Sequence, residues 1–432
     1  MQPSPSLEPS RRHRTVALLG HPGHGKSQLA IALSDRCSAD PMRPWSLKTL
    51  PISYLDLATP LGRSGAPQDS RGTKLSVVRV ESPAYHNFLI DECGSRARIH
   101  EAISACAVSD GAVLVVSALK GPASQTREHA LIAYAMGMRS IVVLITHCDL
   151  VEDPAYIDLV ELETREVLND AGFDGDATPF VRAAPKLHSP LESQWNASLD
   201  DLVDTIDRAI APSVYEQQGD ATAVVLERFE RQTYGSQAVV LLAIRRGKLS
   251  VGQQLRQRAR DGSEVVYLVD GLRVMNEPVA SVAAGDICTV SMKRPEIPRV
   301  KWQPRESYRV RRELRRGRVL HVNPEPELVT TVTSSVAVIQ QARGGRHTPI
   351  VTGHRGALYL GATRVVATVT LPEGCVSLAP GEQVADATLT FDSPVDLLHA
   401  SWVLRDGTDG LQRRFAGLPA WSGTALTGTI MR

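Results

Sequence analysis

The sequence predicts an α/β domain with a parallel sheet, followed by two all-β barrels. Over residues 15–212, short apolar runs alternate with helical patterns, which is typical of strands joined by crossover helices. After Pro212 the chain changes to short runs rich in Val, Thr and Leu, separated by turns that contain glycine. No long amphipathic pattern follows, and in a chain of 432 residues the length of this second part suits two barrels.

The first predicted strand is an apolar run over residues 15–20 that ends in Gly20. A continuous apolar run of this length is typical of a strand buried on both faces, and residues 27–33 continue as a helix. The other predicted strands of this domain lie at residues 88–90, 112–116 and 141–145, and its other helices at residues 125–136 and 155–168. Residues 1–14 have no apolar core, so we expect a flexible tail and not a secretory signal.

The barrels are predicted over residues 213–322 and 323–432. Their clearest strand patterns lie at residues 223–226, 238–244, 264–268 and 365–369.

The composition is that of an ordinary globular chain. The hydrophobic share is 43%, the charged share is 22%, and the net charge of +1 excludes a global field that would attract nucleic acid. Six cysteines show no disulfide framework, which suits a reducing cytoplasm. No apolar run approaches the roughly 18 residues of a membrane span. We therefore expect a cytoplasmic protein without a membrane partner.

A phosphate-binding motif follows the first predicted strand. Residues 20–27 read Gly-His-Pro-Gly-His-Gly-Lys-Ser, which matches Gly-x-x-x-x-Gly-Lys-Ser/Thr between a strand and a helix. Glycines let backbone N–H groups converge on phosphates, and the helix N-terminus adds positive potential. Lys26 would reach the β and γ phosphates, and the Ser27 hydroxyl would ligate Mg²⁺. The alternative is a glycine-rich turn without a ligand, and the motif alone does not choose between ATP and GTP.

Several segments resemble the elongation factor Tu family. Residues 20–29 resemble its phosphate loop, and residues 110–153 closely follow the middle of its GTPase domain. Residues 310–320 resemble its link between the second and third domains, and residues 344–360 and 371–384 resemble its third domain. The resemblance implies a P-loop GTPase domain followed by two β-barrels, with GTP or GDP and Mg²⁺ as cofactors. It also implies aminoacyl-tRNA, the ribosome and a nucleotide-exchange factor as partners.

The resemblance places the guanine-recognition motif at residues 146–149, which read Thr-His-Cys-Asp where the family has Asn-Lys-x-Asp. Asp149 would select guanine, Thr146 would keep a hydroxyl contact, and His147 replaces a lysine whose stem lies along the base. We expect the affinity to fall, and a decayed pocket is the alternative. The implied nucleotide contacts are His21, Pro22, Gly23, His24, Gly25, Lys26, Ser27, Gln28, Asp91, Thr146, His147, Asp149, Leu150, Ala183 and Ala184.

The hydrolysis machinery departs from the family in two places. The Asp-x-Pro-Gly-His switch reads Asp-Glu-Cys-Gly-Ser at residues 91–95, so Gly94 can still face the γ-phosphate while Ser95 replaces the catalytic histidine. Since positioning is most of phosphoryl-transfer catalysis, the loss should cost roughly 10²–10⁴ in rate. His100 is a less favoured substitute. In the other switch the metal-closing threonine is displaced to Thr73 or lost to Lys74. The expected metal ligands are Ser27, Thr73 and Asp91.

The residues that the family uses to bind aminoacyl-tRNA are partly preserved in this sequence. The resemblance assigns Asp286 of the second domain to the aminoacyl pocket, where Ile287 replaces a polar residue, and assigns Arg346, His354 and Arg355 of the third domain to the tRNA. A basic insertion covers residues 293–307, within a run over residues 293–318 that holds eleven Lys and Arg against three Glu. It would bind RNA by phosphate contacts and stacking, or it is a solvated linker.

Three hypotheses follow. The first is a GTP-binding elongation factor Tu-like protein that binds aminoacyl-tRNA and hydrolyses GTP weakly. The second is a non-enzymatic binding module for aminoacyl-tRNA or nucleotide, recruited to a specialised biosynthetic or regulatory role. The third is an interaction protein with a vestigial nucleotide site. The sequence identifies neither the tRNA nor the oligomeric state.

Overall fold

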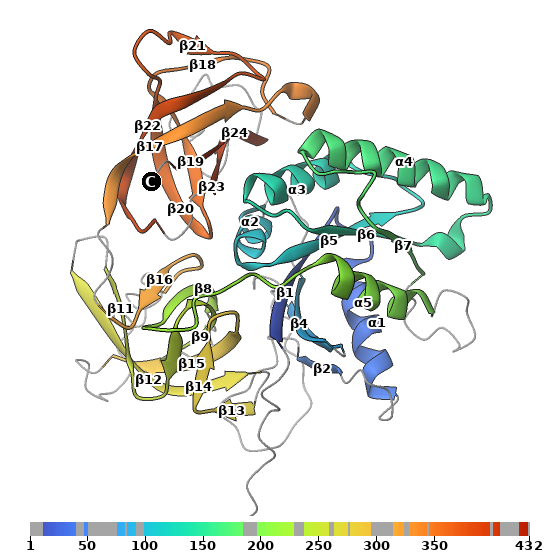
Figure 1. Ribbon diagram of the computed structural model, residues 1–432, viewed down its shortest axis with the longest axis horizontal. Helices are drawn as coiled ribbons and strands as arrows, with labels where there is room; N and C mark the ends of the chain where they lie inside the picture. Colours follow the sequence, from blue (N-terminus) through green and yellow to red (C-terminus); the bar gives the residue numbers. More distant parts are fainter. Residues whose placement is uncertain are drawn as a thin grey trace, which may run out of the picture.

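The chain folds into an α/β domain followed by two antiparallel barrels, which confirms the predicted fold class (Figure 1). The computed structural model describes residues 12–39, 47–50, 76–82, 84–91, 99–184, 197–228, 237–258, 263–274, 277–294, 314–323, 328–343, 345–397, 401–406 and 423–430. Among these residues, no helix has the length and apolarity that crossing a membrane needs.

The sheet of the first domain has seven strands in the order β2-β3-β4-β1-β5-β6-β7. The strands β4, β1, β5, β6 and β7 run parallel, while β2 and β3 add an antiparallel edge. Their bounds are β1 Arg12–Leu19, β2 Leu47–Leu50, β3 Ser76–Glu81, β4 Tyr85–Asp91, β5 Gly111–Ser117, β6 Ile141–Thr146 and β7 Phe180–Arg182. Every residue of β5 and β6 is buried, which explains their continuous apolar sequences.

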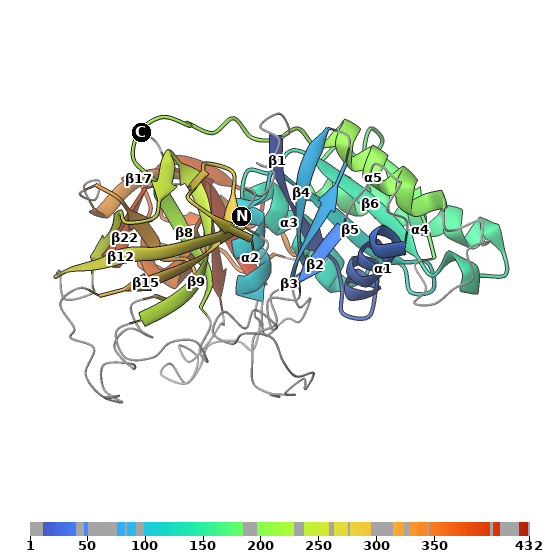
Figure 2. The ribbon, with the colours of Figure 1, turned by 90° about the horizontal axis from the view of Figure 1, so that it is seen from below.

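Helices cover both faces of this sheet (Figures 1 and 2). The helices α1 and α5 pack on one face, and α2, α3 and α4 pack on the other. Their bounds are α1 Lys26–Ala39, α2 Ile99–Val108, α3 Ser124–Ala135, α4 Pro154–Ala171 and α5 Ala197–Ala209. The sequence sets the ends of α4, because Asp153 accepts a hydrogen bond from the Ala155 N–H at 2.9 Å and Gly172 closes the helix with φ +110°.

The first strand begins earlier than the sequence predicts. β1 includes Arg12–Arg14, which pair with Tyr85–Asn87 of β4, although these residues were expected in the tail. Arg14 is fully buried, and its guanidinium donates to the Asn87 side chain at 2.6 Å and to the Ile210 carbonyl at 2.6 Å. A charged residue can lie inside the domain here because its donors are satisfied.

The barrel of the second domain is called the second barrel here. It closes through six strands in the order β11-β16-β8-β9-β15-β12, since β12 also pairs with β11. Its main strands are β8 Thr222–Arg228, β9 Gln237–Arg246, β11 Gln254–Arg258, β12 Glu264–Val274, β15 Ile287–Lys293 and β16 Val319–His321. Short strands β10 Lys248–Ser250, β13 Glu277–Val279 and β14 Ser281–Ala283 complete it. Buried residues alternate with more exposed ones along β12, as expected for a barrel wall.

The barrel of the third domain, called the third barrel here, is a closed ring of β17-β22-β20-β19-β23-β24. Its strands are β17 Val329–Val338, β19 His354–Leu360, β20 Thr363–Thr370, β22 Gln383–Val395, β23 Ser401–Asp406 and β24 Gly423–Thr429. A small sheet of β18 Ile350–Val351 and β21 Ser377–Leu378 lies at one end (Figure 1). The indole of Trp402 is fully buried in this barrel and donates to the Ser334 hydroxyl at 2.7 Å.

Asp110, which precedes β5, holds the segment that leads from the first domain to the second barrel. Its carboxylate accepts hydrogen bonds from the Thr15 N–H at 2.8 Å, the Ser213 N–H at 2.9 Å and the Tyr215 hydroxyl at 2.8 Å. Arg245 of β9 then donates to the Tyr215 oxygen at 3.0 Å. The segment after Pro212 is thus tied to the sheet on one side and to the second barrel on the other.

A buried ion pair joins the first domain to the third barrel. Helix α3 packs against β23 and β24, and the Glu128 carboxylate of α3 lies 2.6 Å from the Arg405 guanidinium of β23. Glu128 is 8% exposed and Arg405 is 2% exposed. Removing one partner of such a pair leaves the other charge without compensation in a poorly solvated place.

We predict that Arg405→Met lowers the free energy of unfolding by about 3–5 kcal/mol, because it leaves the buried Glu128 carboxylate without its ion-pair partner. Urea denaturation followed by circular dichroism measures the change. The matched control is Arg256→Met, which removes a partly exposed partner of Glu264 on the second barrel and should have little effect. Equal losses in the two variants would contradict the prediction.

Candidate nucleotide-binding site

The phosphate loop connects β1 to α1, and its glycines have backbone angles that other residues adopt only with strain. Gly20, Gly23 and Gly25 have φ values of +132°, +77° and +95°. A Cβ added at Gly20 would collide with the Val115 carbonyl oxygen of β5. The glycine spacing therefore follows from the close approach of the loop to the sheet.

The lysine of the motif is folded into this loop. The Lys26 ammonium donates to the Gly20 carbonyl at 2.7 Å and to the His21 carbonyl at 3.0 Å, and the side chain is only 6% exposed. Its positive charge therefore lies against the loop backbone, where it could bind a phosphate held by the loop amides. His21, Pro22 and Gln28, the other predicted contacts here, lie at the exposed or half-exposed rim.

Three neighbouring elements hold the loop. The Thr146 hydroxyl at the end of β6 donates to the His24 carbonyl at 2.7 Å, and the Ser117 N–H of β5 donates to the His24 ring at 3.3 Å. From α3, His129 accepts a hydrogen bond at Nδ1 from the Gly20 N–H at 3.0 Å. The sequence motifs did not identify Ser117 and His129, because these contacts join residues about a hundred positions apart.

The two histidine rings in this set are held neutral. Burial, followed by the nearby charges of His21 and Lys26, lowers the pKa of His24 to about 4. Burial, followed by Lys26 and Arg405, lowers the pKa of His129 to about 3. Both rings use Nδ1 as an acceptor, which requires the neutral form.

Asp91 and Ser27 form the predicted metal position. The Ser27 hydroxyl donates to Asp91 Oδ2 at 2.8 Å, while Asp91 Oδ1 is buried and has no hydrogen-bond partner among the described residues. Burial raises the pKa of Asp91, and the Ser27 hydrogen bond and Lys26 oppose this shift. A hydroxyl and an unsatisfied carboxylate oxygen are hard ligands that fit Mg²⁺. The described part of the chain has no cluster of three or more His, Cys, Asp or Glu that could hold a metal ion.

The predicted base loop follows β6. His147 has left-handed backbone angles, with φ +60° and ψ +27°, and its Nδ1 lies 2.9 Å from the Ser117 hydroxyl. Asp149 lies on the next short helix, Cys148–Leu150, and Leu150 is 54% exposed beside it. After β7, the Ala183 N–H donates to the Ile145 carbonyl at 2.8 Å, which fixes Ala183 and Ala184 behind the base loop. The structure thus brings the phosphate and base motifs together through Thr146.

Part of the predicted hydrolysis machinery lies outside the described residues. This applies to Thr73, Lys74, Gly94 and Ser95. His100 is described, and it lies half-buried in the first turn of α2.

The predicted tRNA residues do not form one cluster in the described structure. Arg346 lies 3.2 Å from the His354 ring and donates to Thr348, while Arg355 pairs with Asp392 on the surface of the third barrel. Asp286 belongs to the second barrel and pairs with His13 of β1, so its carboxylate serves a contact between domains. Ile287 is buried in that barrel's core. Residues 295–313 of the basic run lie outside the described residues.

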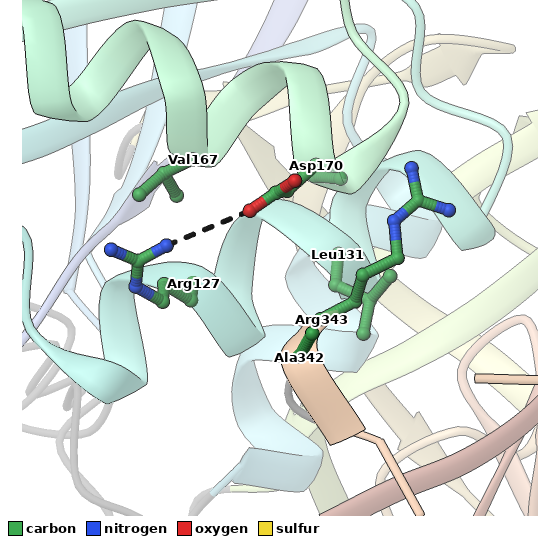
Figure 3. Close-up of a pocket in the computed structure, with 7 residues that line it drawn as sticks. Arg127, Leu131, Val167, Asp170, Ala342 and Arg343 are labelled. Carbon is green, nitrogen blue, oxygen red and sulfur yellow. Dashed lines mark ion pairs between the residues drawn. The ribbon is translucent and has the colours of Figure 1, made fainter. Parts of the chain in front are cut away.

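A separate crevice lies between the first domain and the third barrel (Figure 3). It encloses about 10 Å³, which is room for one water molecule. Arg127 and Asp170 face each other across it at 3.8 Å, and Arg343 approaches from the third barrel. Its size and position separate it from the nucleotide site.

These features define a P-loop nucleotide-binding domain. The family model of the elongation factor Tu GTP-binding domain matches residues 11–212, which contain the first domain. Over the whole chain the fold is similar to that of translation elongation factor SelB from Methanococcus maripaludis, solved in complex with the GTP analogue GppNHp. The TM-score is 0.68 at 16% identity, and the match covers 98% of this chain and 80% of that chain. The fold of this chain, a P-loop domain followed by two barrels, is therefore similar to that of this solved elongation factor.

We predict that His129 makes the protein less stable in mild acid. Its pKa is about 3 in the folded chain and 6.5 in the unfolded chain, so between these values only the unfolded chain binds a proton there. Stability is complete above pH 6.5 and falls as the pH decreases, by about 2 kcal/mol between pH 7.5 and pH 5.

Urea unfolding of the wild type and of His129→Gln at both pH values measures this effect. Glutamine can still accept from the Gly20 N–H but does not titrate. The decline should be about 2 kcal/mol smaller in the variant. An equal decline in both proteins would show that His129 does not titrate on unfolding as proposed.

Proposed function

We propose that this protein binds GTP and GDP with Mg²⁺, carries aminoacyl-tRNA in the cytoplasm as elongation factor Tu-like proteins do, and hydrolyses GTP slowly. The observation that carries the proposal is the phosphate loop, in which the Lys26 ammonium already sits under the loop backbone, held by the Gly20 and His21 carbonyls. A triphosphate would exchange contacts with this preformed charge without a large rearrangement.

The metal part of the proposal rests on Ser27 and Asp91. The Ser27 hydroxyl would ligate Mg²⁺, and Asp91, already hydrogen-bonded to it, would hold the ion directly or through water. When bound, Mg²⁺ neutralises charge on the β- and γ-phosphates. Exchange of the Ser27 hydrogen bond for an ionic contact also compensates the buried Asp91 carboxylate.

Guanine selection is assigned to Asp149 and the neighbouring backbone. The carboxylate would accept from the two N–H donors of guanine, which adenine lacks at those positions. The Ala184 N–H, in the loop that follows β7, would donate to the guanine carbonyl. Leu150 and the His147 ring would supply apolar contact along the base.

Aminoacyl-tRNA binding is supported by the two barrels and by the adjacent Arg346 and His354. The Asp286–His13 contact adds a condition, since Asp286 can serve an aminoacyl group only when it leaves His13. A gel shift with aminoacyl-tRNA tests this part with GTP and with GDP present. Binding that is equal with both nucleotides and no turnover with ribosomes would favour the non-enzymatic carrier.

We predict that calorimetric titration shows binding of GTP and GDP and not of ATP. Asp149→Asn should weaken GTP binding roughly ten- to a hundredfold, because hydrogen bonds to a charged group contribute about 1.5–3 kcal/mol. Glu152→Gln, an exposed carboxylate three residues away, is the matched control and should bind normally. Equal binding of ATP, or no nucleotide binding by the wild type, would refute the proposed function.

We predict that Ser95→His raises GTP turnover roughly 10²–10⁴-fold, by returning a group that can position the attacking water. Single-turnover hydrolysis with ribosomes measures the rate, and Ser95→Ala is the control for loss of the hydroxyl. An unchanged rate in Ser95→His would mean that the missing histidine is not what limits hydrolysis.

A further inference from the structure

A second lysine, Lys120, approaches the phosphate loop from the turn that follows β5. The turn is fixed by its backbone, because the Ala118 N–H donates to the Thr146 carbonyl at 2.8 Å and the Gly121 N–H donates to the Ser117 carbonyl at 2.9 Å. Thr146 and Ser117 are also the residues that hold His24. The position of Lys120 is therefore set by the same framework that shapes the loop.

The Lys120 ammonium lies beside Gly23, the second glycine of the loop. A Cβ added at Gly23 would lie 3.8 Å from Lys120 Nζ, which is its one neighbour within 4 Å among the described residues beyond the adjoining chain. The same charge contributes to lowering the pKa of His24 and the pKa of His147, in each case after burial. The ammonium thus lies near the phosphate loop and near the base loop at once.

This placement is unfavourable for a lysine that only covers the surface. Lys120 is exposed, and a long side chain in such a place normally extends into water. Here its charge lies near that of Lys26, since both ammonium groups act to lower the pKa of His24, and like charges repel. Among the described residues no hydrogen bond or ion pair engages the Lys120 ammonium. An anion in the loop would make the arrangement favourable.

We propose that Lys120 is a nucleotide-binding residue whose ammonium contacts the phosphate chain beside Gly23. The inference rests on the proposed GTP-binding function and deepens it. In this view the turn after β5 supplies a positive charge that the base loop has lost, since His147 stands where the Asn-Lys-x-Asp motif has lysine. Lysine suits this role because its compact ammonium binds phosphate as a point charge.

The test is calorimetric titration of GTP and GDP into the full-length protein with Mg²⁺. Lys120→Met should weaken both nucleotides roughly ten- to a hundredfold, the usual range for a charge-assisted hydrogen bond. Lys120→Arg should keep most of the affinity, and the salt dependence of binding should be shallower in Lys120→Met than in the wild type. The matched control is Lys248→Met, which removes an exposed lysine from β10 of the second barrel.

The outcomes separate the inference from the function on which it rests. If the wild type binds GTP and Lys120→Met binds it equally well, the role of Lys120 is refuted and the proposed function stands. If the wild type binds no nucleotide, both are refuted.

A second pair of variants tests the replacement of the lost motif lysine. His147→Lys should restore affinity in the Lys120→Met background and gain much less in the wild type, because one ammonium would then substitute for the other. Equal gains in the two backgrounds would show that residues 120 and 147 act independently. Thermal unfolding of each variant confirms that it is folded.

Discussion

The phosphate loop depends on hydrogen bonds that come from outside it. A strand that turns directly into a helix exposes backbone groups that need partners or a ligand. Thr146 of β6 and His129 of α3 supply such partners, and Ser117 of β5 donates to the His24 ring. The loop therefore takes its shape only when the sheet and α3 are assembled around it. The nucleotide site is a product of the tertiary fold, although its sequence motif is local.

The electrostatics of the site follow from this assembly. Burial removes His24 and His129 from water and favours their neutral forms, and the surrounding cations act in the same direction. The positive charge that remains is that of Lys26, with Lys120 at the rim. Asp91 is the only buried carboxylate among the predicted nucleotide- and metal-binding residues that the structure describes, and burial raises its pKa. A polyanion with a divalent cation would satisfy both the lysines and this carboxylate, whereas either ion alone would leave one of them uncompensated.

The sequence predicted the elements that are decided by local patterns. Strands β5 and β6 are continuous apolar runs because both of their faces are covered, and α4 has a cap at each end. The sequence did not predict the start of β1, because a charged residue such as Arg14 is typical of an exposed tail. Its burial is possible because Asn87 and the end of α5 accept its hydrogen bonds. Lys26 and Ser27 were predicted as site residues from motif spacing, and Asp149 from the family resemblance. His129 and Lys120 were not, since their relation to the loop depends on how α3 and the β5 turn lie in space.

Helix α3 shows why such long-range relations matter. Glu128 and His129 are neighbours in sequence, and successive residues of a helix project about 100° apart. One therefore reaches Arg405 in the third barrel while the other reaches the Gly20 N–H in the phosphate loop. Both contacts are buried, so neither can be exchanged for water without cost. A displacement of α3 that follows the third barrel must lengthen the bond to Gly20, and one that follows the loop must separate Glu128 from Arg405. The position of the third barrel and the backbone of the phosphate loop are thus constrained by the same turn of helix.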